Sequence, residues 1–494
     1  MLENLSDAFS LFLTFDNIAI VFVGVIIGTV VGAIPGMTTP MGVALALPFT
    51  FTMQPVTGIL LLLGIYKGGL YGGSITAILI KAPGTPAASC TVLDGYPLTQ
   101  KGEARKALDM ALYASCFADF VSNLSLILLV GLLATFALKF GPPEFFTLIV
   151  FSLTIIAGVS GDNLIKGIAA AAMGLIFATI GLDMVYGTNR FVFDNWQLMG
   201  GLNFIPVLIG LFALPEIIHY FTGKVSDQVK TAVMTGVGAS FADFKACFKS
   251  ILRGSLIGVV LGSIPGIGGA PSAFLSYSEA RRNSKNPENF GKGELEGVAA
   301  AEAGNNGVAG ATMIPLLALG VPGDVITAVI LGAFMIHGLR PGPVMFAENI
   351  TMIYALFIGI MLSSVYLFIV GKFSIRAISR IAEVPNRILY PIVLVFCLFG
   401  SFAINNSSFD VLVMLLMGVV GYIMMVFRFP APPFLIAFIL GPLLEDNFRQ
   451  SMILSEGSPD ILFRSPICWV FWAMTSASVY FLIKSRQKNI PLAG

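Results

Sequence analysis

GSIPGIGGAPS, at residues 262–272, directly follows an apolar run at residues 254–261 that contains no charged side chain. Proline and glycine both interrupt a helix, so this stretch predicts a helix that ends abruptly. In a chain this apolar we expect the break inside a membrane, where irregular backbone is tolerated only if protein or a water-filled cavity satisfies its polar groups. A broken helix exposes N–H groups at one end and C=O groups at the other, which suit an anion and a cation respectively.

The same pattern occurs earlier in the chain. Residues 24–36, GVIIGTVVGAIPG, align without gaps on residues 254–266, GSLIGVVLGSIPG. A second Pro-Gly break follows each copy, PGTP at 83–86 and VPGD at 321–324. Interrupted apolar segments at matching places in two halves indicate a transporter binding site. The glycines spaced four residues apart are also explained by close helix packing, and for them alone we favour that interpretation.

The composition predicts a polytopic membrane protein. Of 494 residues, 56% are hydrophobic and only 11% are charged, and the mean hydropathy is +0.89. Soluble domains carry roughly a quarter charged residues. The five cysteines and two histidines are scattered, so we expect neither a disulfide framework nor a transition-metal site, and no cofactor beyond a coupling cation. The net charge of +1 gives no support for a nucleic-acid partner.

These observations together predict the fold class. We expect an all-α polytopic membrane protein with two inverted structural repeats, broken helices or re-entrant hairpins, and about 11 to 12 transmembrane segments. The first transmembrane repeat is predicted at 1–222, a polar cytoplasmic linker at 223–253, and the second repeat, with further spans and a short basic tail, at 254–494. Residues 94–97, Asp-Gly-Tyr-Pro, predict a turn after the first PGTP break.

The distribution of lysine and arginine predicts the orientation. Basic loops occur at 101–106, 224–253, 281–292 and 372–387 and in the C-terminal tail. The positive-inside rule assigns them to the cytoplasm. The acidic N-terminal stretch, without lysine or arginine up to Asp16, is then periplasmic and the C-terminus cytoplasmic. The first copy of the repeat therefore begins outside and the second inside, which makes the repeats inverted.

The breaks supply the candidate ligands. Hydroxyls and bare amides at the tips suit an anion, whereas unpaired carbonyls, carboxamides and carboxylates suit a cation, for which we expect Na⁺. The candidate substrate-binding residues are Thr38, Thr39, Lys81, Pro83, Gly84, Thr85, Pro86, Gly266, Gly268, Gly269 and Ser272. The candidate cation-binding residues are Asn305, Asn306, Pro322, Gly323 and Asp324.

Structural explanations also exist for several of the polar candidates. The hydroxyls of Thr85 and Ser272 can bond back to helix carbonyls. The Asn305-Asn306 pair can form interhelical hydrogen bonds. Asp324 can bind a cation, accept a proton, or cap the helix that follows it.

Three further charged residues lie in apolar surroundings. Lys67 and Lys81 could balance a polyanionic substrate, or they could extend to the membrane interface. Glu302 is expected near the inner interface and is less informative.

Ordered motifs run through most of the chain. They are KGGLYGGSITAILI at 67–80, PGTPAA at 83–88 and LDGYPL at 93–98, followed by IPGIG at 264–268, EGVAA at 296–300, EAGNN at 302–306 and GVPG at 320–323. This series closely resembles the large membrane subunit of tripartite tricarboxylate transporters, the TctA family. Lys81 departs from the family pattern, which often has Asn before the Pro-Gly break.

The resemblance implies a function and partners. Members of this family are bacterial inner-membrane permeases that work with a small membrane subunit and a periplasmic solute-binding protein. They import carboxylates, citrate being the namesake, and an ion gradient, Na⁺ or H⁺, drives the import. An elevator-type motion of the broken helices is expected by analogy.

We therefore predict a secondary carboxylate importer and not an enzyme. An intramembrane enzyme would need a catalytic constellation, and the sequence has no His-Glu-x-x-His, no Gly-x-Ser-x-Gly and no paired catalytic acids. A passive channel would predict a polar pore stripe rather than duplicated broken helices. A stand-alone secondary carrier for another small anion is the remaining alternative.

Overall fold

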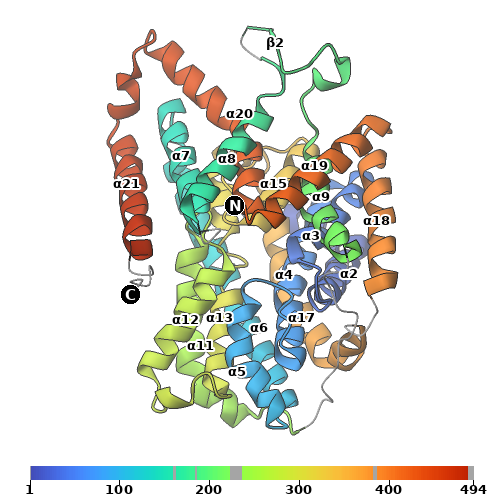
Figure 1. Cartoon of the computed structure of the whole chain (residues 1–494). Helices are drawn as coiled ribbons and strands as arrows, with labels where there is room; N and C mark the ends of the chain where they lie inside the picture. The colour runs from blue at the N-terminus through green and yellow to red at the C-terminus, as the bar shows by residue number, and fades with distance from the viewer. Residues whose placement is uncertain (1, 160–162, 184–185, 223–235, 382–385, 488–494) are drawn as a thin grey trace, which may run out of the picture.

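The computed structural model describes residues 2–159, 163–183, 186–222, 236–381 and 386–487, and this part of the chain is almost entirely helical (Figure 1). The helices of the first half are α1 (Leu2–Phe12), α2 (Phe15–Gly32), α3 (Thr39–Ala46), α4 (Pro55–Ile80), α5 (Ala88–Gln100), α6 (Ala104–Ala137), α7 (Pro142–Val159), α8 (Leu164–Ala178), α9 (Phe204–Phe212) and α10 (Leu214–Phe221). Those of the second half are α11 (Phe241–Gly262), α12 (Gly269–Asn283), α13 (Leu295–Asn306), α14 (Met313–Leu319), α15 (Val325–Ile336), α16 (Pro343–Glu348), α17 (Ile350–Ile381), α18 (Asn386–Ala403), α19 (Ser408–Val426), α20 (Ala431–Leu454) and α21 (Pro466–Gln487).

Short 3₁₀ helices and one strand pair complete the described chain. The 3₁₀ helices are η1 (Leu47–Thr52), η2 (Trp196–Leu198), η3 (Pro287–Asn289) and η4 (Pro459–Phe463). Strands β1 (Gly181–Leu182) and β2 (Asn189–Arg190) pair antiparallel, with Gly181 opposite Arg190.

Six described helical segments are long and apolar enough to cross a membrane: 15–32, 55–80, 104–137, 204–221, 350–373 and 408–426. Shorter apolar helices cover 39–52, 142–158, 164–178, 325–336 and 387–403. The prediction of an all-helical polytopic membrane protein is confirmed at this level. The total number of spans and the inverted repeats stay predictions.

The glycines spaced by four residues let helix backbones touch. In α2, a Cβ added at Gly28 would lie only 2.2 Å from the backbone oxygen of Ile65 in α4. In α11, a Cβ added at Gly258 would lie 2.7 Å from the Cα of Gly307, just after α13. Only glycine permits such approaches. The packing interpretation of these glycines is confirmed.

Helix α5 corrects one prediction. Residues 94–97, predicted as a turn, lie inside the helix, and Pro97 is an internal proline. The reason is tertiary: Asp94 is fully buried, and its Oδ1 accepts hydrogen bonds of 2.8 Å from the backbone N–H groups of Gly291, Gly293 and Glu294. Asp94 thereby ties α5 to the loop that begins α13, and this contact outweighs the local cost of Pro97.

Helix α11 begins earlier than the composition suggested. It starts at Phe241, inside the range 223–253 predicted as a linker, while residues 223–235 lie outside the described residues. Ser240 and Asp243 form a capping box at this start, with Asp243 N bonded to Ser240 Oγ at 3.2 Å. The Ser-x-x-Asp spacing is the sequence signal that fixes this helix start.

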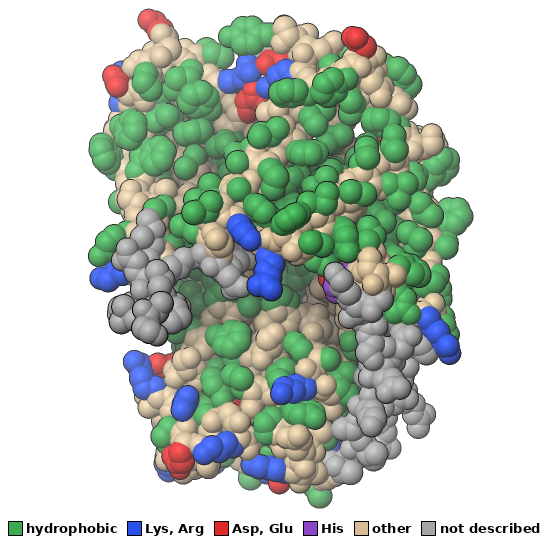
Figure 2. Space-filling view, viewed as in Figure 1, with side chains coloured by type: hydrophobic (Ala, Val, Ile, Leu, Met, Phe, Trp, Pro, Cys, Tyr) green, Lys and Arg blue, Asp and Glu red, His purple; other side chains and the backbone are tan. Residues whose placement is uncertain are grey.

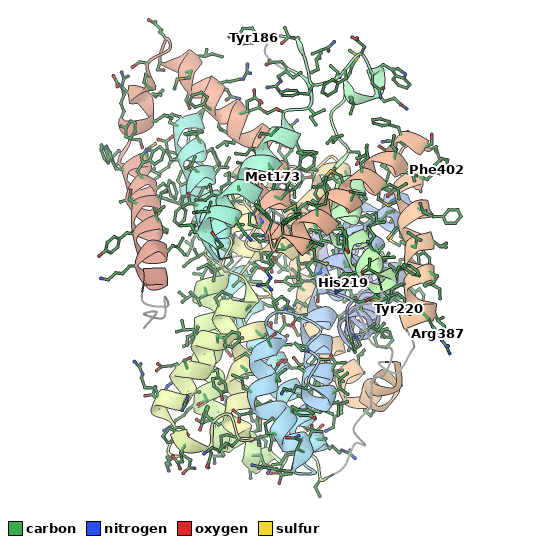
Figure 3. All side chains as sticks on the ribbon, viewed as in Figure 1. Met173, Tyr186, His219, Tyr220, Arg387 and Phe402 are labelled. Carbon is green, nitrogen blue, oxygen red and sulfur yellow. The ribbon has the colours of Figure 1, made fainter. Side chains whose placement is uncertain are left out.

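Parts of four predicted basic segments come together at one end of the molecule, whereas the C-terminal helix α21 ends at mid-height (Figure 1). Lys106 forms an ion pair with Asp243 at 3.0 Å, Lys372 forms one with Asp109 at 3.0 Å, and Lys101 reaches the backbone oxygen of Gly293. Figure 2 shows lysine and arginine side chains over the lower part of the face in view, around α5, α11 and α12 of Figure 1. Tyr186 lies at the opposite end, beside β2 (Figure 3).

Candidate functional site

The first PGTP break joins α4 to α5. Helix α4 ends at Lys81, which adopts the left-handed conformation with φ of 60°, and Ala82 N–H donates back to Thr76 O. Three residues after Lys81, a Cβ added at Gly84 would lie 1.9 Å from the backbone oxygen of Gly32 at the end of α2. The Thr85 hydroxyl accepts a hydrogen bond from the N–H of Ala88, the first residue of α5, rather than bonding back to a carbonyl.

The second break, VPGD, repeats this geometry. Helix α14 ends at Gly320 with φ of 71°, and Val321 N–H donates back to Pro315 O. Asp324 then caps α15, its Oδ1 accepting from Thr327 N at 2.7 Å. The capping role considered for Asp324 is confirmed. Its second oxygen accepts a hydrogen bond of 2.8 Å from the Tyr66 hydroxyl of α4.

The two breaks of the second half meet in space, beside the first half. Gly266 N–H donates to Gly323 O at 2.7 Å, and a Cβ at Gly268 would lie 3.4 Å from the Cβ of Asp324. At the start of α12, a Cβ at Gly269 would contact Asn305 Oδ1 at 3.0 Å and the Cβ of Ala87 before α5 at 3.4 Å. The IPG and VPGD breaks therefore touch each other, and the N-terminus of α5 lies beside them.

Several predicted ligands are buried without a hydrogen-bond partner among the described residues. They are the Thr39 hydroxyl, the Ser272 hydroxyl and the Asn305 side-chain oxygen. Leaving a buried polar atom unpaired costs about 1–3 kcal/mol, so such atoms are open to a ligand. Thr38 instead caps α3 by accepting from Met41 N. Helix α12 begins after Gly268, at φ of 67°, and no side chain caps its first turn.

The tips of the first-half breaks are more accessible than the helices around them. Gly36, Lys81, Pro83 and Pro86 are exposed, whereas α4 is buried along nearly its whole length. The Lys81 ammonium lies 6.0 Å from the centre of the Tyr96 ring. Figure 2 shows that the molecule is hollowed at mid-height on the face in view. Accessible backbone at broken helices is what a transport site needs.

Glu302 and Asn306 form a separate buried cluster on α13. The carboxylate of Glu302 is fully buried and accepts from Ser74, Thr91 and Ser115 and from the Asn306 amide. Glu302 is thus enclosed by protein, and its expected position near the inner interface stays a prediction. The two predicted asparagines also separate, since Asn305 faces Gly269 while Asn306 belongs to the Glu302 cluster. An acid within a run of small apolar residues was the sequence signal for this cluster.

Lys67 forms a buried ion pair that the sequence did not predict. Its ammonium contacts both carboxylate oxygens of Asp119 at 3.1 Å and also donates to Asn123 Oδ1 at 2.9 Å and Ile360 O at 3.0 Å. The Lys67 side chain is only 2% exposed. Lys67 thus neither extends to an interface nor points to an accessible site. It holds α4, α6 and α17 together.

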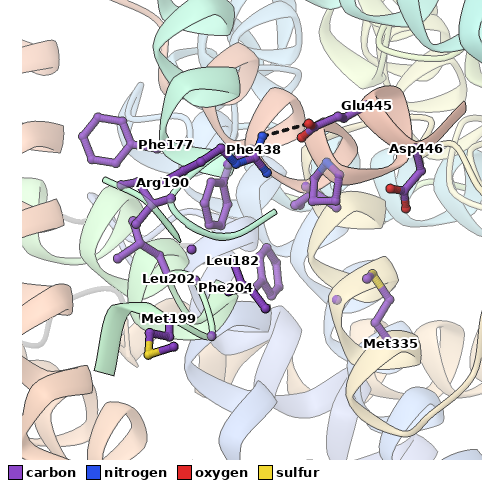
Figure 4. Close-up of a pocket in the computed structure, with 18 of the residues that line it drawn as sticks. Phe177, Leu182, Arg190, Met199, Leu202, Phe204, Met335, Phe438, Glu445 and Asp446 are labelled. Atoms are coloured by element: carbon purple, nitrogen blue, oxygen red, sulfur yellow. Dashed lines mark hydrogen bonds and ion pairs between the residues drawn. The ribbon is translucent and has the colours of Figure 1, made fainter. Parts of the chain in front are cut away.

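A cavity of about 570 Å³ lies apart from the breaks, between α8, α20 and the segment that carries β1 and β2 (Figure 4). Arg190 and Glu445 form an ion pair of 2.8 Å at its wall, and Arg449 joins Glu445 to Asp183. Burial raises the pKa of Glu445, but hydrogen bonds from both guanidinium groups outweigh it and hold the pKa below its usual value. None of the predicted site residues lines this cavity.

The fold and the converging breaks define a multi-pass membrane protein with a transporter's arrangement of interrupted helices. Residues 18–436 match the tripartite tricarboxylate transporter TctA family, and the chain belongs to this family of non-enzymatic bacterial transporters. It is 36% identical over 494 residues to an Agrobacterium vitis protein described as an uncharacterized 52.8 kDa protein in the TAR-I ttuC′ 3′ region, covering 99% of this chain and 98% of the relative.

A second relative is similar over part of the chain. It is an uncharacterized protein in the TAR-II ttuC′ 3′ region of Agrobacterium vitis, 36% identical over 210 residues, which make up 42% of this chain and 87% of the relative. No solved structure matches the chain. The family assignment confirms the resemblance and the prediction that the chain is a transporter subunit.

Proposed function

We propose that this chain is the permease subunit that imports a dicarboxylate or tricarboxylate, such as citrate, coupled to a Na⁺ or H⁺ gradient. A small membrane subunit and a periplasmic solute-binding protein complete the transporter. The observation that carries the proposal is the meeting of the two second-half breaks beside the N-terminus of α5, where the polar atoms of Ser272 and Asn305 are buried and unpaired. Such atoms are costly in a membrane protein unless a ligand uses them.

The site offers one set of groups for the anion and another for the cation. The uncapped start of α12, with the Ser272 hydroxyl in its first turn, presents N–H and O–H donors to a carboxylate. The Asn305 oxygen beside Gly269, and Asp324 beside Gly268, present acceptors to a cation. Binding the cation would lower the cost of placing a polyanion inside the membrane.

The two halves act as inverted repeats in this proposal. In support, Lys81 and Gly320 follow the last residues of α4 and α14 in the same left-handed conformation. Thr85 and Asp324, each directly after a Pro-Gly pair, both accept a hydrogen bond from the backbone N–H three residues later. The clustered basic loops at one end support a cytoplasmic assignment of that end. Inverted repeats with broken helices suit alternating access around a central site.

The test is uptake of labelled citrate and a panel of dicarboxylates and tricarboxylates. Membrane vesicles containing this subunit and its small partner would receive an imposed Na⁺ or H⁺ gradient, with purified binding protein added or omitted. Accumulation that requires the binding protein and one gradient supports the proposal. Gradient-driven uptake without the binding protein would favour a stand-alone carrier, and no uptake of any acid would remove the substrate class.

Replacing Asp324 by asparagine removes the negative charge and keeps the N-cap of α15, so it tests which of the two matters for transport. Asparagine is an equally good N-cap, and the Tyr66 hydroxyl can accept from the new amide, so we expect a stability change within about 1 kcal/mol. The cation dependence of uptake should weaken strongly. Asp243→Asn removes the same charge from the capping box of α11 and should leave cation dependence intact. If Asp324→Asn behaves the same way, Asp324 only caps α15.

Replacing Lys81 by asparagine should separate backbone strain from anion binding. Asparagine tolerates the left-handed conformation better than lysine, so the free energy of unfolding should rise by up to about 1 kcal/mol. If the exposed ammonium attracts the substrate, the KM should rise more for a tricarboxylate than for a dicarboxylate, because the lost attraction scales with charge. Equal KM values for wild type and variant across the panel would assign Lys81 to the helix end alone.

A further inference from the structure

Glu302 is a buried acid that the proposed binding site does not use. It has no exposed surface and lies on α13 among alanine and glycine residues. Within the described part of the chain, no lysine, arginine or histidine forms an ion pair with it. An acid held inside a membrane protein without a counter-ion is expensive when charged and typically marks an ion or proton pathway.

The groups around Glu302 suit both of its protonation states. Ser74 Oγ donates to Oε1 at 2.6 Å and shares that oxygen with Thr91, while Ser115 Oγ and Asn306 Nδ2 donate to Oε2 at 3.0 and 3.3 Å. Four donors satisfy an ionised carboxylate. Three of them are hydroxyls, which can turn and accept a hydrogen bond instead. A protonated Glu302 can therefore donate to the same hydroxyls, which a lysine or arginine partner would not allow.

The partners of Glu302 suit a proton. The Ser74 and Ser115 hydroxyls donate directly to the carboxylate at 2.6 and 3.0 Å, which are ordinary hydrogen-bond lengths, and a hydroxyl can equally accept from a carboxylic acid. We propose that Glu302 carries the coupling proton, becoming a carboxylic acid on one side of the membrane and returning H⁺ to water on the other. This inference rests on the proposed function.

The other titratable groups nearby do not compete for this role. Tyr71 of α4 and Cys90 of α5 interact electrostatically with Glu302, and Cys116 lies on α6, but side chains of both types are ordinarily neutral at pH 7. Asp119 on α6 is paired with Lys67.

The remaining packed helices contribute groups that are occupied or lie at the far end of α13. Tyr277 of α12 donates to Asp94 of α5. Cys247 of α11 interacts instead with Glu296 and Glu294 at the start of α13. Glu302 is thus the acid in this cluster that is free to change its protonation state.

The cluster is also placed to influence the transport site. Asn306 donates to Glu302, and the adjacent Asn305 lies against Gly269 at the start of α12. The Asn306 amide also donates to Ser115 Oγ at 2.8 Å, so loss of the Glu302 charge weakens hydrogen bonds that both side chains make to it at the end of α13 that carries Asn305. The same event reaches α4, α5 and α6 through Ser74, Thr91 and Ser115. Proton binding can thus bias a movement of these helices.

Glu302→Gln tests the proposal because glutamine imitates the protonated acid. In vesicles with the full transporter, we expect equilibrium exchange of labelled carboxylate to persist. Accumulation driven by a pH gradient should fall to the level without a gradient, and the pH dependence of uptake should flatten. Glu296→Gln is the matched control, since Glu296 lies on the same helix and also accepts from serine hydroxyls, Ser250 and Ser284. It should retain wild-type behaviour.

Two outcomes would overturn the role of Glu302. One is wild-type gradient-driven accumulation in Glu302→Gln. The other is a folded variant that loses exchange and accumulation alike while its residual uptake keeps the wild-type pH profile, which indicates a structural role. Should Glu302→Gln fail to fold, Glu302→Asp keeps an acid and should keep proton-driven accumulation with a displaced pH profile. An undisplaced profile would count against the proposal.

An infrared measurement separates this inference from the proposed function. Difference spectra recorded across a pH titration of the purified protein should show a protonated carboxyl C=O band that Glu302→Gln lacks and Glu296→Gln keeps. This result does not depend on knowing the substrate. Wild-type protein that transports no carboxylate but shows the band would contradict the proposed function alone, and the absence of the band would contradict the proton site.

Discussion

Replacing Gly84 by alanine is expected to abolish uptake. A Cβ at this position would stand 1.9 Å from the backbone oxygen of Gly32 and 3.0 Å from the Cα of Gly73, so it meets the main chains of α2 and α4 rather than a flexible side chain. Relief requires the break to move away from both helices. Overpacking of this kind costs about 1–3 kcal/mol, and 3 kcal/mol corresponds to roughly a 100-fold loss of the correctly assembled site.

The prediction is measured as uptake in vesicles together with thermal unfolding in detergent. Gly131→Ala is the control, because it makes the same substitution in the exposed surface of α6 with nothing within 4 Å of the added carbon. It should retain uptake and be slightly stabilising, as alanine favours a helix over glycine. Gly323→Ala should resemble Gly84→Ala, since its added carbon would lie 2.7 Å from the Cα and O of Thr312. Normal uptake by Gly84→Ala would show that the first break can shift freely.

The positions of the breaks could be predicted from the sequence because their causes are local. Proline removes a backbone donor and glycine permits positive φ, and these properties act wherever the residues occur. The structure accordingly ends α2 and α11 just before their Ile-Pro-Gly motifs, and Gly36 and Gly266 have φ of 86° and 88°. Lys81 follows the same logic, since the left-handed conformation after α4 favours glycine or asparagine at this position.

What the sequence did not reveal depends on contacts between distant segments. Asp94 was predicted to lie in a turn because Gly-Tyr-Pro follows it. Its carboxylate instead accepts hydrogen bonds from N–H groups before α13, which lie about 200 residues later in the sequence. Glu302 has partners on α4, α5 and α6, none of which lies near it in sequence. Periodicity and local propensity carry no information about such pairs. Only the presence of acids in apolar segments hinted at them.

Replacing Lys67 by methionine is expected to lower the free energy of unfolding by about 3–5 kcal/mol, the usual cost of breaking a buried ion pair from one side. Methionine keeps most of the side-chain volume, so the principal change is the loss of charge. Asp119, whose side chain is 1% exposed, would then be an uncompensated charge between α4, α6 and α17. Thermal and denaturant unfolding in detergent measure the effect. Lys139→Met removes a lysine from an exposed position and should change stability by less than about 0.5 kcal/mol.

Adding Asp119→Asn to Lys67→Met should restore most of this loss. The amide removes the stranded charge and can still accept from Asn123 and Ser364, which donate to Asp119 in the wild type. The double variant should therefore be less destabilised than Lys67→Met alone. The loss of unfolding free energy in the double variant should be smaller than the sum of the losses in the two single variants. If the second substitution makes the protein less stable still, the cost of losing Lys67 comes from packing and from its bond to Ile360 O rather than from the unpaired carboxylate.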